Sequence, residues 1–147
     1  MGFVADYDAK DNILRITFEG NLTDEVALMC SQALRKSLAS ESPFNVIIDL
    51  TGVTKYDVSP EFIGRIAMGR PSQSPSVRVL VIVAPKDYAY GMSRMFQQLS
   101  ESNRPNQSVV RSMEDAYRVL GLNSPEFMPL KSVEGEGSSG EQPPRLP

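Results

Sequence analysis

The segment from Val46 to Phe62 constrains the fold more than any other part of the chain. It begins with the uninterrupted apolar run 46–48, which is typical of a strand buried on both faces, as in a parallel sheet. It ends with Ser59, Pro60 and Glu61: a capping hydroxyl, a proline at the first helical position and an acid in the first turn. A buried strand that leads through a polar cluster to a helix start predicts an α/β fold.

The same two patterns alternate along the chain. Period-two or continuous apolar runs predict strands at residues 3–7, 13–18, 44–49, 77–83 and 108–111. Apolar residues at helical spacing predict helices that follow Thr23, Ser59, Asp87 and Ser112. The order ββαβαβαβα predicts a single α/β domain with a mostly parallel, mixed sheet packed by helices, whose first two strands are antiparallel because a short turn joins them.

The composition changes after residue 122. Residues 132–147 are rich in Gly, Ser, Glu and Pro and contain almost no apolar side chains. Such a segment cannot bury enough apolar surface to offset the entropy lost on ordering. We therefore predict one domain at residues 1–122 and an acidic, disordered tail at residues 123–147.

The composition argues against several classes of function. The chain contains no His, which removes Ser-His-Asp and Cys-His catalysis and the commonest metal ligand. Its net charge of −3 argues against nucleic-acid binding, and no window approaches ~18 consecutive apolar residues. Cys30, the single cysteine, lies on the apolar face of a predicted helix and is expected to be a packed thiol. We predict a cytoplasmic protein that is not an enzyme, with no metal, cofactor, nucleic acid or membrane insertion.

Three motifs resemble the STAS domain family, which includes bacterial anti-sigma-factor antagonists and the cytoplasmic domains of sulfate transporters. Residues 49–53 (D-L-T-G-V) and 57–60 (D-V-S-P) are similar, in register, to the family pattern D-L-S-G-V, three residues, D-S-S-G. Residues 20–22 are similar to the G-x-L part of a G-x-L-D turn, and residues 109–116 match a late V-x-x-S-x-x-x-A. The resemblance spans about residues 3–122.

The resemblance implies a regulatory role for Ser59. In the antagonists, the second Ser of D-S-S-G is phosphorylated by an anti-sigma factor that is also a serine kinase, and that position is Ser59 here. Three positions depart from the pattern. Val58 replaces the first Ser, Pro60 replaces the Gly, and Thr23 stands at the acid of the turn, with Asp24 directly after it.

We therefore expect a regulatory binding module, resembling an anti-sigma-factor antagonist, that is switched by phosphorylation of Ser59. Its protein partner, an anti-sigma factor or serine kinase, is expected to contact Thr23, Asp24, Asp57, Val58, Pro60 and Glu61. Asp49 and Gly52 are expected to structure the loop that leads to Ser59. Asp49 would accept N–H bonds there, and Gly52 would supply a backbone angle closed to other residues.

One alternative reading concerns a bound ligand. A SpoIIAA-like protein that shares its fold with the CRAL-TRIO lipid-binding proteins would carry a small ligand or lipid and have no phospho-switch. Tyr88, Tyr90, Met92 and Met95 would then line a pocket, although their spacing favours core packing for the methionines. The sequence leaves open whether the protein forms a homodimer.

Overall fold

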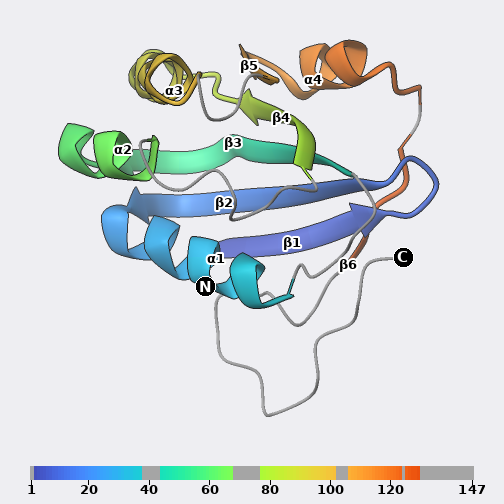
Figure 1. Cartoon of the computed structure of the whole chain (residues 1–147), viewed down its shortest axis with the longest axis horizontal. Helices are drawn as coiled ribbons and strands as arrows, with labels where there is room; N and C mark the ends of the chain where they lie inside the picture. Colours follow the sequence, from blue (N-terminus) through green and yellow to red (C-terminus); the bar gives the residue numbers. More distant parts are fainter. Residues whose placement is uncertain (1, 38–43, 68–76, 102–105, 124, 130–147) are drawn as a thin grey trace.

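The computed structural model describes residues 2–37, 44–67, 77–101, 106–123 and 125–129; within these, the side chains of residues 31 and 33–37 are left undescribed. A six-stranded sheet runs through the molecule in the order β5-β4-β3-β2-β1-β6 (Figure 1). The strands are β1 (Phe3–Asp8), β2 (Ile13–Thr23), β3 (Phe44–Asp57), β4 (Val77–Val83), β5 (Gln107–Val110) and β6 (Met128–Pro129). The helices are α1 (Asp24–Ser37), α2 (Pro60–Ala67), α3 (Asp87–Leu99) and α4 (Met113–Leu120).

The strand directions agree with the predicted fold class. Strands β2, β3, β4 and β5 pair in parallel, whereas β1 is antiparallel to both β2 and β6. The predicted order ββαβαβαβα is confirmed, and β6 is added at its end. No helix in the described part of the chain is long and apolar enough to cross a membrane.

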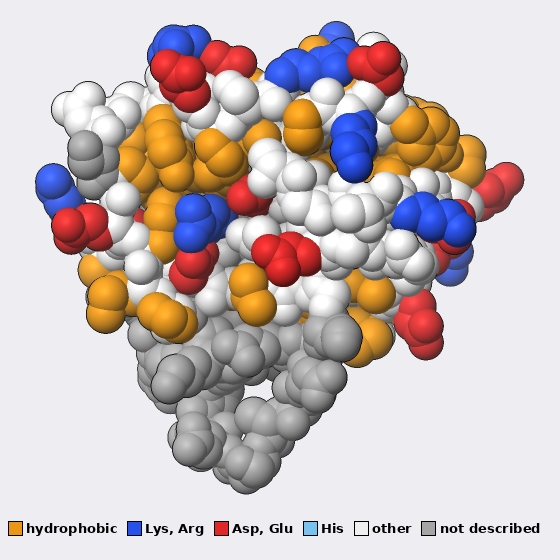
Figure 2. All heavy atoms as spheres, turned by 180° about the vertical axis from the view of Figure 1, so that it is seen from behind, with side chains coloured by type: hydrophobic (Ala, Val, Ile, Leu, Met, Phe, Trp, Pro, Cys, Tyr) orange, Lys and Arg blue, Asp and Glu red, His pale blue; other side chains and the backbone are white. Residues whose placement is uncertain are grey.

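The two faces of the sheet are covered by different helices. Alternate strand residues enter two separate cores: Val46 joins the larger one with α1, α2 and α3, and its neighbour Ile47 joins the smaller one with α4. This alternation confirms that the run 46–48 belongs to a strand buried on both faces. Seen from behind, apolar side chains gather at the end of the molecule where α4 lies (Figure 2).

Strands β2 and β3 are longer than their sequences predict. Gly20 and Asn21 were expected to end the first, and a polar turn was expected after Asp49. Instead, β2 continues to Thr23 and β3 to Asp57, and these two residues are partners in the ladder. Neither polar segment has a strand pattern of its own. Paired in the sheet, each supplies the hydrogen-bond partners for the backbone N–H and C=O groups of the other. Two register shifts interrupt this pairing, and Gly20 has a φ of 75° beside the second of them.

The chain packs against the domain beyond the predicted boundary at residue 122. Phe127 joins the smaller core, and its ring lies 4.0 Å from the guanidinium carbon of Arg15. The Glu126 amide donates to the buried carboxylate of Asp8 at 2.8 Å, and β6 then pairs with β1. We call residues 125–129 the C-terminal strap. Residues 130–147 of the predicted tail lie outside the described residues.

Candidate functional site at the start of the second helix

Ser59 caps helix α2, as its sequence context predicts. Its Oγ accepts a hydrogen bond from the Phe62 amide at 3.1 Å, and its carbonyl accepts one from the Ile63 amide at 3.1 Å. Pro60 then begins the helix with a nitrogen that has no hydrogen to satisfy. The cap fixes the Ser59 side chain at the carboxyl end of β3, where it is half-buried and still reaches solvent.

The carboxylate of Asp24 binds Ser59 through two further hydrogen bonds. The Ser59 amide donates to Asp24 Oδ1 at 2.9 Å, and the Ser59 hydroxyl donates to Asp24 Oδ2 at 2.9 Å. We call this arrangement the Asp24 clasp. It joins the start of α1 to the start of α2, which lie at the same end of the sheet (Figure 1). The hydroxyl thus accepts from the helix and donates to a carboxylate at the same time.

The shift of the acid from position 23 to position 24 has a structural reason. Thr23 uses its own Oγ1 to cap α1, accepting from the Val26 amide at 3.2 Å, while its backbone pairs with Asp57. Asp24, as the first residue of α1, is then placed to reach Ser59. The structure therefore brings an acid to Ser59 although the motif position is Thr.

The other residues assigned to the partner surface separate into two groups. Asp57, Pro60 and Glu61 are exposed around Ser59, and Thr23 is half-buried beside them. Val58 differs, because it is only 3% exposed and packs in the larger core. Val58 directly follows β3, and its side chain lies on the side opposite to exposed Asp57, so Val58 anchors the segment from inside and is not presented to a partner.

Asp49 and Gly52 lie within strand β3 and not in a loop. Asp49 is 7% exposed, and its Oδ1 accepts from the amide and the hydroxyl of Thr51 at 2.9 and 2.7 Å, which is the local bonding expected of it. The interpretation of Gly52 as a residue of special backbone angle is wrong, because its φ lies outside the left-handed region. A Cβ there would come within 3.1 Å of Glu19 Cγ, so close packing is the reason for glycine.

An aromatic pair next to the clasp was not recognised from the sequence. The rings of Tyr56 and Tyr88 meet edge to face, with centroids 5.5 Å apart and planes at 72°. Burial, the neighbouring Tyr88 and then Asp24 raise the pKa of Tyr56 to about 12. Had the strand been extended to Asp57, period-two alternation would have turned Tyr56 toward the side of the larger core.

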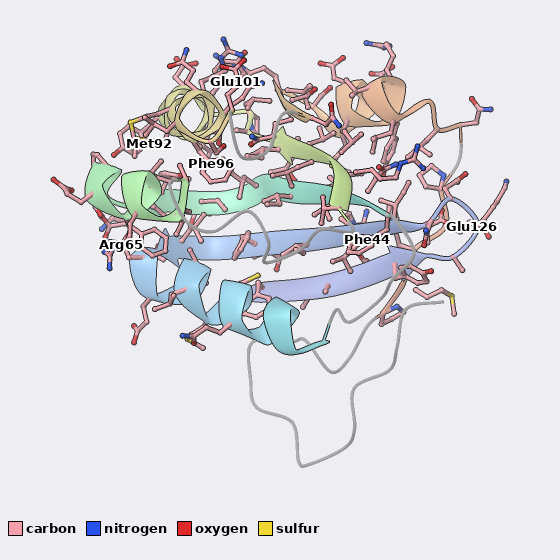
Figure 3. The ribbon with its side chains drawn as sticks, viewed as in Figure 1. Phe44, Arg65, Met92, Phe96, Glu101 and Glu126 are labelled. Carbon is pink, nitrogen blue, oxygen red and sulfur yellow. The ribbon has the colours of Figure 1, made fainter. Side chains whose placement is uncertain are left out.

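The side chains proposed to line a pocket are largely part of the core. Met92 and Phe96 of α3 are buried in the larger cluster, and Met95 packs against it (Figure 3). Tyr90 is covered by Arg111, whose guanidinium carbon lies 4.0 Å from the ring centroid. Cys30 is buried in the same core, and burial raises its pKa to about 12, which agrees with a packed thiol.

The described residues contain no group of three or more Cys, Asp or Glu side chains placed to hold a metal ion. Six of the described acids instead lie in the first turns of helices, where they interact favourably with the helix dipole. These residues are Asp24, Glu25, Glu61, Asp87, Glu114 and Asp115.

Comparison with known proteins gives the fold. No family model matches the sequence, and no curated protein matches it significantly. Among solved structures, the chain is similar to an uncharacterized protein of the DUF3478 family, with a SpoIIAA-like fold, from Shewanella loihica. The TM-score is 0.52 at 14% identity, over 81% of this chain and 94% of that chain. The protein therefore has a SpoIIAA-like fold, which confirms the predicted α/β fold class and the SpoIIAA-like part of the prediction.

Proposed function

We propose that the protein is a non-enzymatic binding module of the STAS type, in which phosphorylation of Ser59 controls the binding of a protein partner. The observation that carries the proposal is the Asp24 clasp. It places the hydroxyl of half-buried Ser59 at a helix start and in contact with a carboxylate. In protein kinases, a carboxylate of the kinase itself accepts the proton of the attacked hydroxyl. Asp24 is positioned to orient that hydroxyl when a serine kinase approaches Ser59.

A phosphate on Ser59 would disturb the clasp directly. The esterified oxygen can no longer donate to Asp24, and the added group carries about −1.5 to −2 charges next to that carboxylate. A hydrogen bond to a charged group contributes about 1.5–3 kcal/mol, whereas a phosphate at a helix N-terminus regains only about 0.3–1 kcal/mol. Loss of the hydroxyl bond in the clasp is therefore the larger effect, and the contact between the starts of α1 and α2 weakens.

The expected consequence is weaker binding by the phosphorylated form. A new ion pair between the phosphate and a partner would contribute about 1 kcal/mol at 4 Å in water. That gain is smaller than the loss of about 1.5–3 kcal/mol for the hydrogen bond to Asp24. The partner accordingly recognises the unmodified surface around Asp57, Pro60 and Glu61. Its identity, as the resemblance implies, is an anti-sigma factor that is also the serine kinase.

The test is phosphorylation by radiolabelled ATP in an extract of the host cell, followed by mass spectrometry of the recovered protein. Ser112 provides a matched control, because it also caps a helix, accepting from the Asp115 amide at 3.1 Å. Among the described residues, no carboxylate is recorded as an acceptor for its hydroxyl. We expect one phosphoryl group in the wild type and in Ser112→Ala, none in Ser59→Ala and slower labelling in Asp24→Asn. Label that persists in Ser59→Ala, or a wild type that is never labelled, would contradict the proposal.

A further inference from the structure

The exposed residues around Ser59, namely Asp57, Pro60 and Glu61, are called the Ser59 surface below. Tyr88 is an exposed aromatic residue at its edge. Its side chain is 55% exposed, yet its ring is held by the edge-to-face contact with Tyr56. Tyr56 directly precedes Asp57 and pairs with Leu22 in the sheet, so Tyr88 borders the Asp24 clasp. A rigid, exposed tyrosine is the kind of residue that dominates the binding energy of protein interfaces.

The surroundings of Tyr88 are acidic. Asp24, Glu25, Asp57 and Glu61 lie at this end of the sheet. They are opposed by Lys55, by Arg65, which Figure 3 places at this end, and by Lys86, whose ammonium donates to the Val53 carbonyl at 2.8 Å. Within the described part of the chain, Glu25, Asp57 and Glu61 have no ion-pair partner. The excess of carboxylates favours a partner that brings positive charge.

A nearby tyrosine shows which cation fits. Tyr90, two residues further along α3, carries the guanidinium of Arg111 on its ring at 4.0 Å. The same guanidinium donates to Asp87 Oδ1 at 2.8 Å. Tyr88 has the matching ring and nearby acids, but no cation of the described residues lies on it. An arginine from a second molecule would complete the arrangement that Tyr90 already shows.

We propose that Tyr88 determines the specificity of the Ser59 surface, and that the partner is a protein that places an arginine on its ring. This inference rests on the proposed function, since it takes the Ser59 surface to be a protein-binding surface. Arginine is favoured over lysine because a planar guanidinium can stack on the phenol and pair with a carboxylate together.

The probe is an arginine octapeptide, compared with lysine and glutamate octapeptides of the same length. The tyrosine ring signals are followed by nuclear magnetic resonance, and Tyr88→Phe assigns the signal of Tyr88. We expect the arginine peptide to shift that signal, with an affinity that falls as salt is added. Tyr88→Ala should weaken binding by roughly threefold, Tyr88→Phe should preserve it, and Glu61→Gln should weaken it.

Val119→Ala is the matched control, because Val119 is 48% exposed but lies on α4. Thermal unfolding confirms that each variant is folded. Equal affinity in Tyr88→Ala, an equal response to the glutamate peptide, or a response confined to other tyrosines would overturn the proposal. Equal binding of the lysine peptide would overturn the choice of arginine. The experiment needs no kinase, so its failure is separate from failure of Ser59 labelling.

Discussion

Two aspartates join distant segments at two separate places in the sheet, and they do so in different ways. Asp8 is 1% exposed and, among the described residues, accepts from two backbone amides, those of Asp11 at 3.1 Å and Glu126 at 2.8 Å. Asp24 is half-buried and accepts from both the amide and the hydroxyl of Ser59. Figure 3 shows Glu126 at the end of the molecule away from helix α2.

The difference separates a structural contact from one that can be regulated. A backbone amide has no hydroxyl that a kinase can phosphorylate, so phosphorylation cannot switch the Asp8 contact. A serine hydroxyl can be esterified, and the Asp24 clasp would lose one of its two hydrogen bonds when that happens. The same carboxylate chemistry therefore supports stability at one place and a switch at the other.

The largest expected effect is loss of the Asp8 contact. Asp8→Ala leaves two amides without their acceptor and detaches the C-terminal strap from the β1–β2 turn, so we expect a loss of about 3 kcal/mol. Urea unfolding measures it. Glu126→Ala is the control, because it keeps the backbone amide and should change the stability by less than about 0.5 kcal/mol. Similar losses in the two variants would show that the strap is held by side chains instead.

A smaller loss is expected at the Asp24 clasp. Ser59→Ala removes a helix cap and a donor to Asp24, for about 2 kcal/mol, whereas Ser112→Ala removes a cap alone, for about 1 kcal/mol. A double-mutant cycle of Ser59→Ala with Asp24→Ala should give a coupling of about 1 kcal/mol. Additive effects would mean that the bond from the Ser59 hydroxyl to Asp24 contributes nothing in solution, which would leave Asp24, like Asp8, bound through a backbone amide.

The loss of stability at alkaline pH should differ between the Asp24 and Asp8 contacts, because each has a neighbouring tyrosine with a raised pKa. Burial raises the pKa of Tyr56, beside Asp24, from 10.0 to about 12, and burial followed by Asp8 raises that of Tyr7. Because the unfolded chain loses these protons first, stability is complete below about pH 10 and falls as the pH rises through 12. Unfolding at about pH 8 and about pH 11 should show a smaller loss in Tyr56→Phe than in the wild type. An unchanged loss would place the alkaline sensitivity elsewhere, with Cys30 as the next candidate.

The smallest effect concerns the glycines of strands β2 and β3 near the clasp. Gly52→Ala should cost less than about 1 kcal/mol, because the contacted Glu19 Cγ belongs to a flexible side chain. Gly20→Ala should cost about 1–2 kcal/mol, because Gly20 has a φ of 75°. Thermal unfolding of both variants and of the wild type measures these stability losses. A larger cost at Gly52 would mean that Glu19 cannot move aside, or that the Phe18 carbonyl oxygen, 3.4 Å from the added Cβ, limits the space.

The local features of the site were predictable because they depend on neighbours in the chain. The caps at Ser59, Thr23 and Ser112 each join residues three apart, and the sequence signatures of helix starts describe that spacing. The paired extensions of β2 and β3 were not predictable in the same way. Each is a polar segment whose partner lies about thirty residues away, and nothing local indicates the pairing.

The sequence by itself determined the order of strands and helices, the helix caps and the two-sided burial of β3, because hydrophobic period and capping residues act over a few positions. Only the tertiary structure decided that Asp24 replaces the missing acid at Thr23, that Val58 is buried and that the strap closes on Asp8. These contacts join residues 35 to 118 positions apart. Their formation depends on the packing of the whole sheet, which no local pattern specifies.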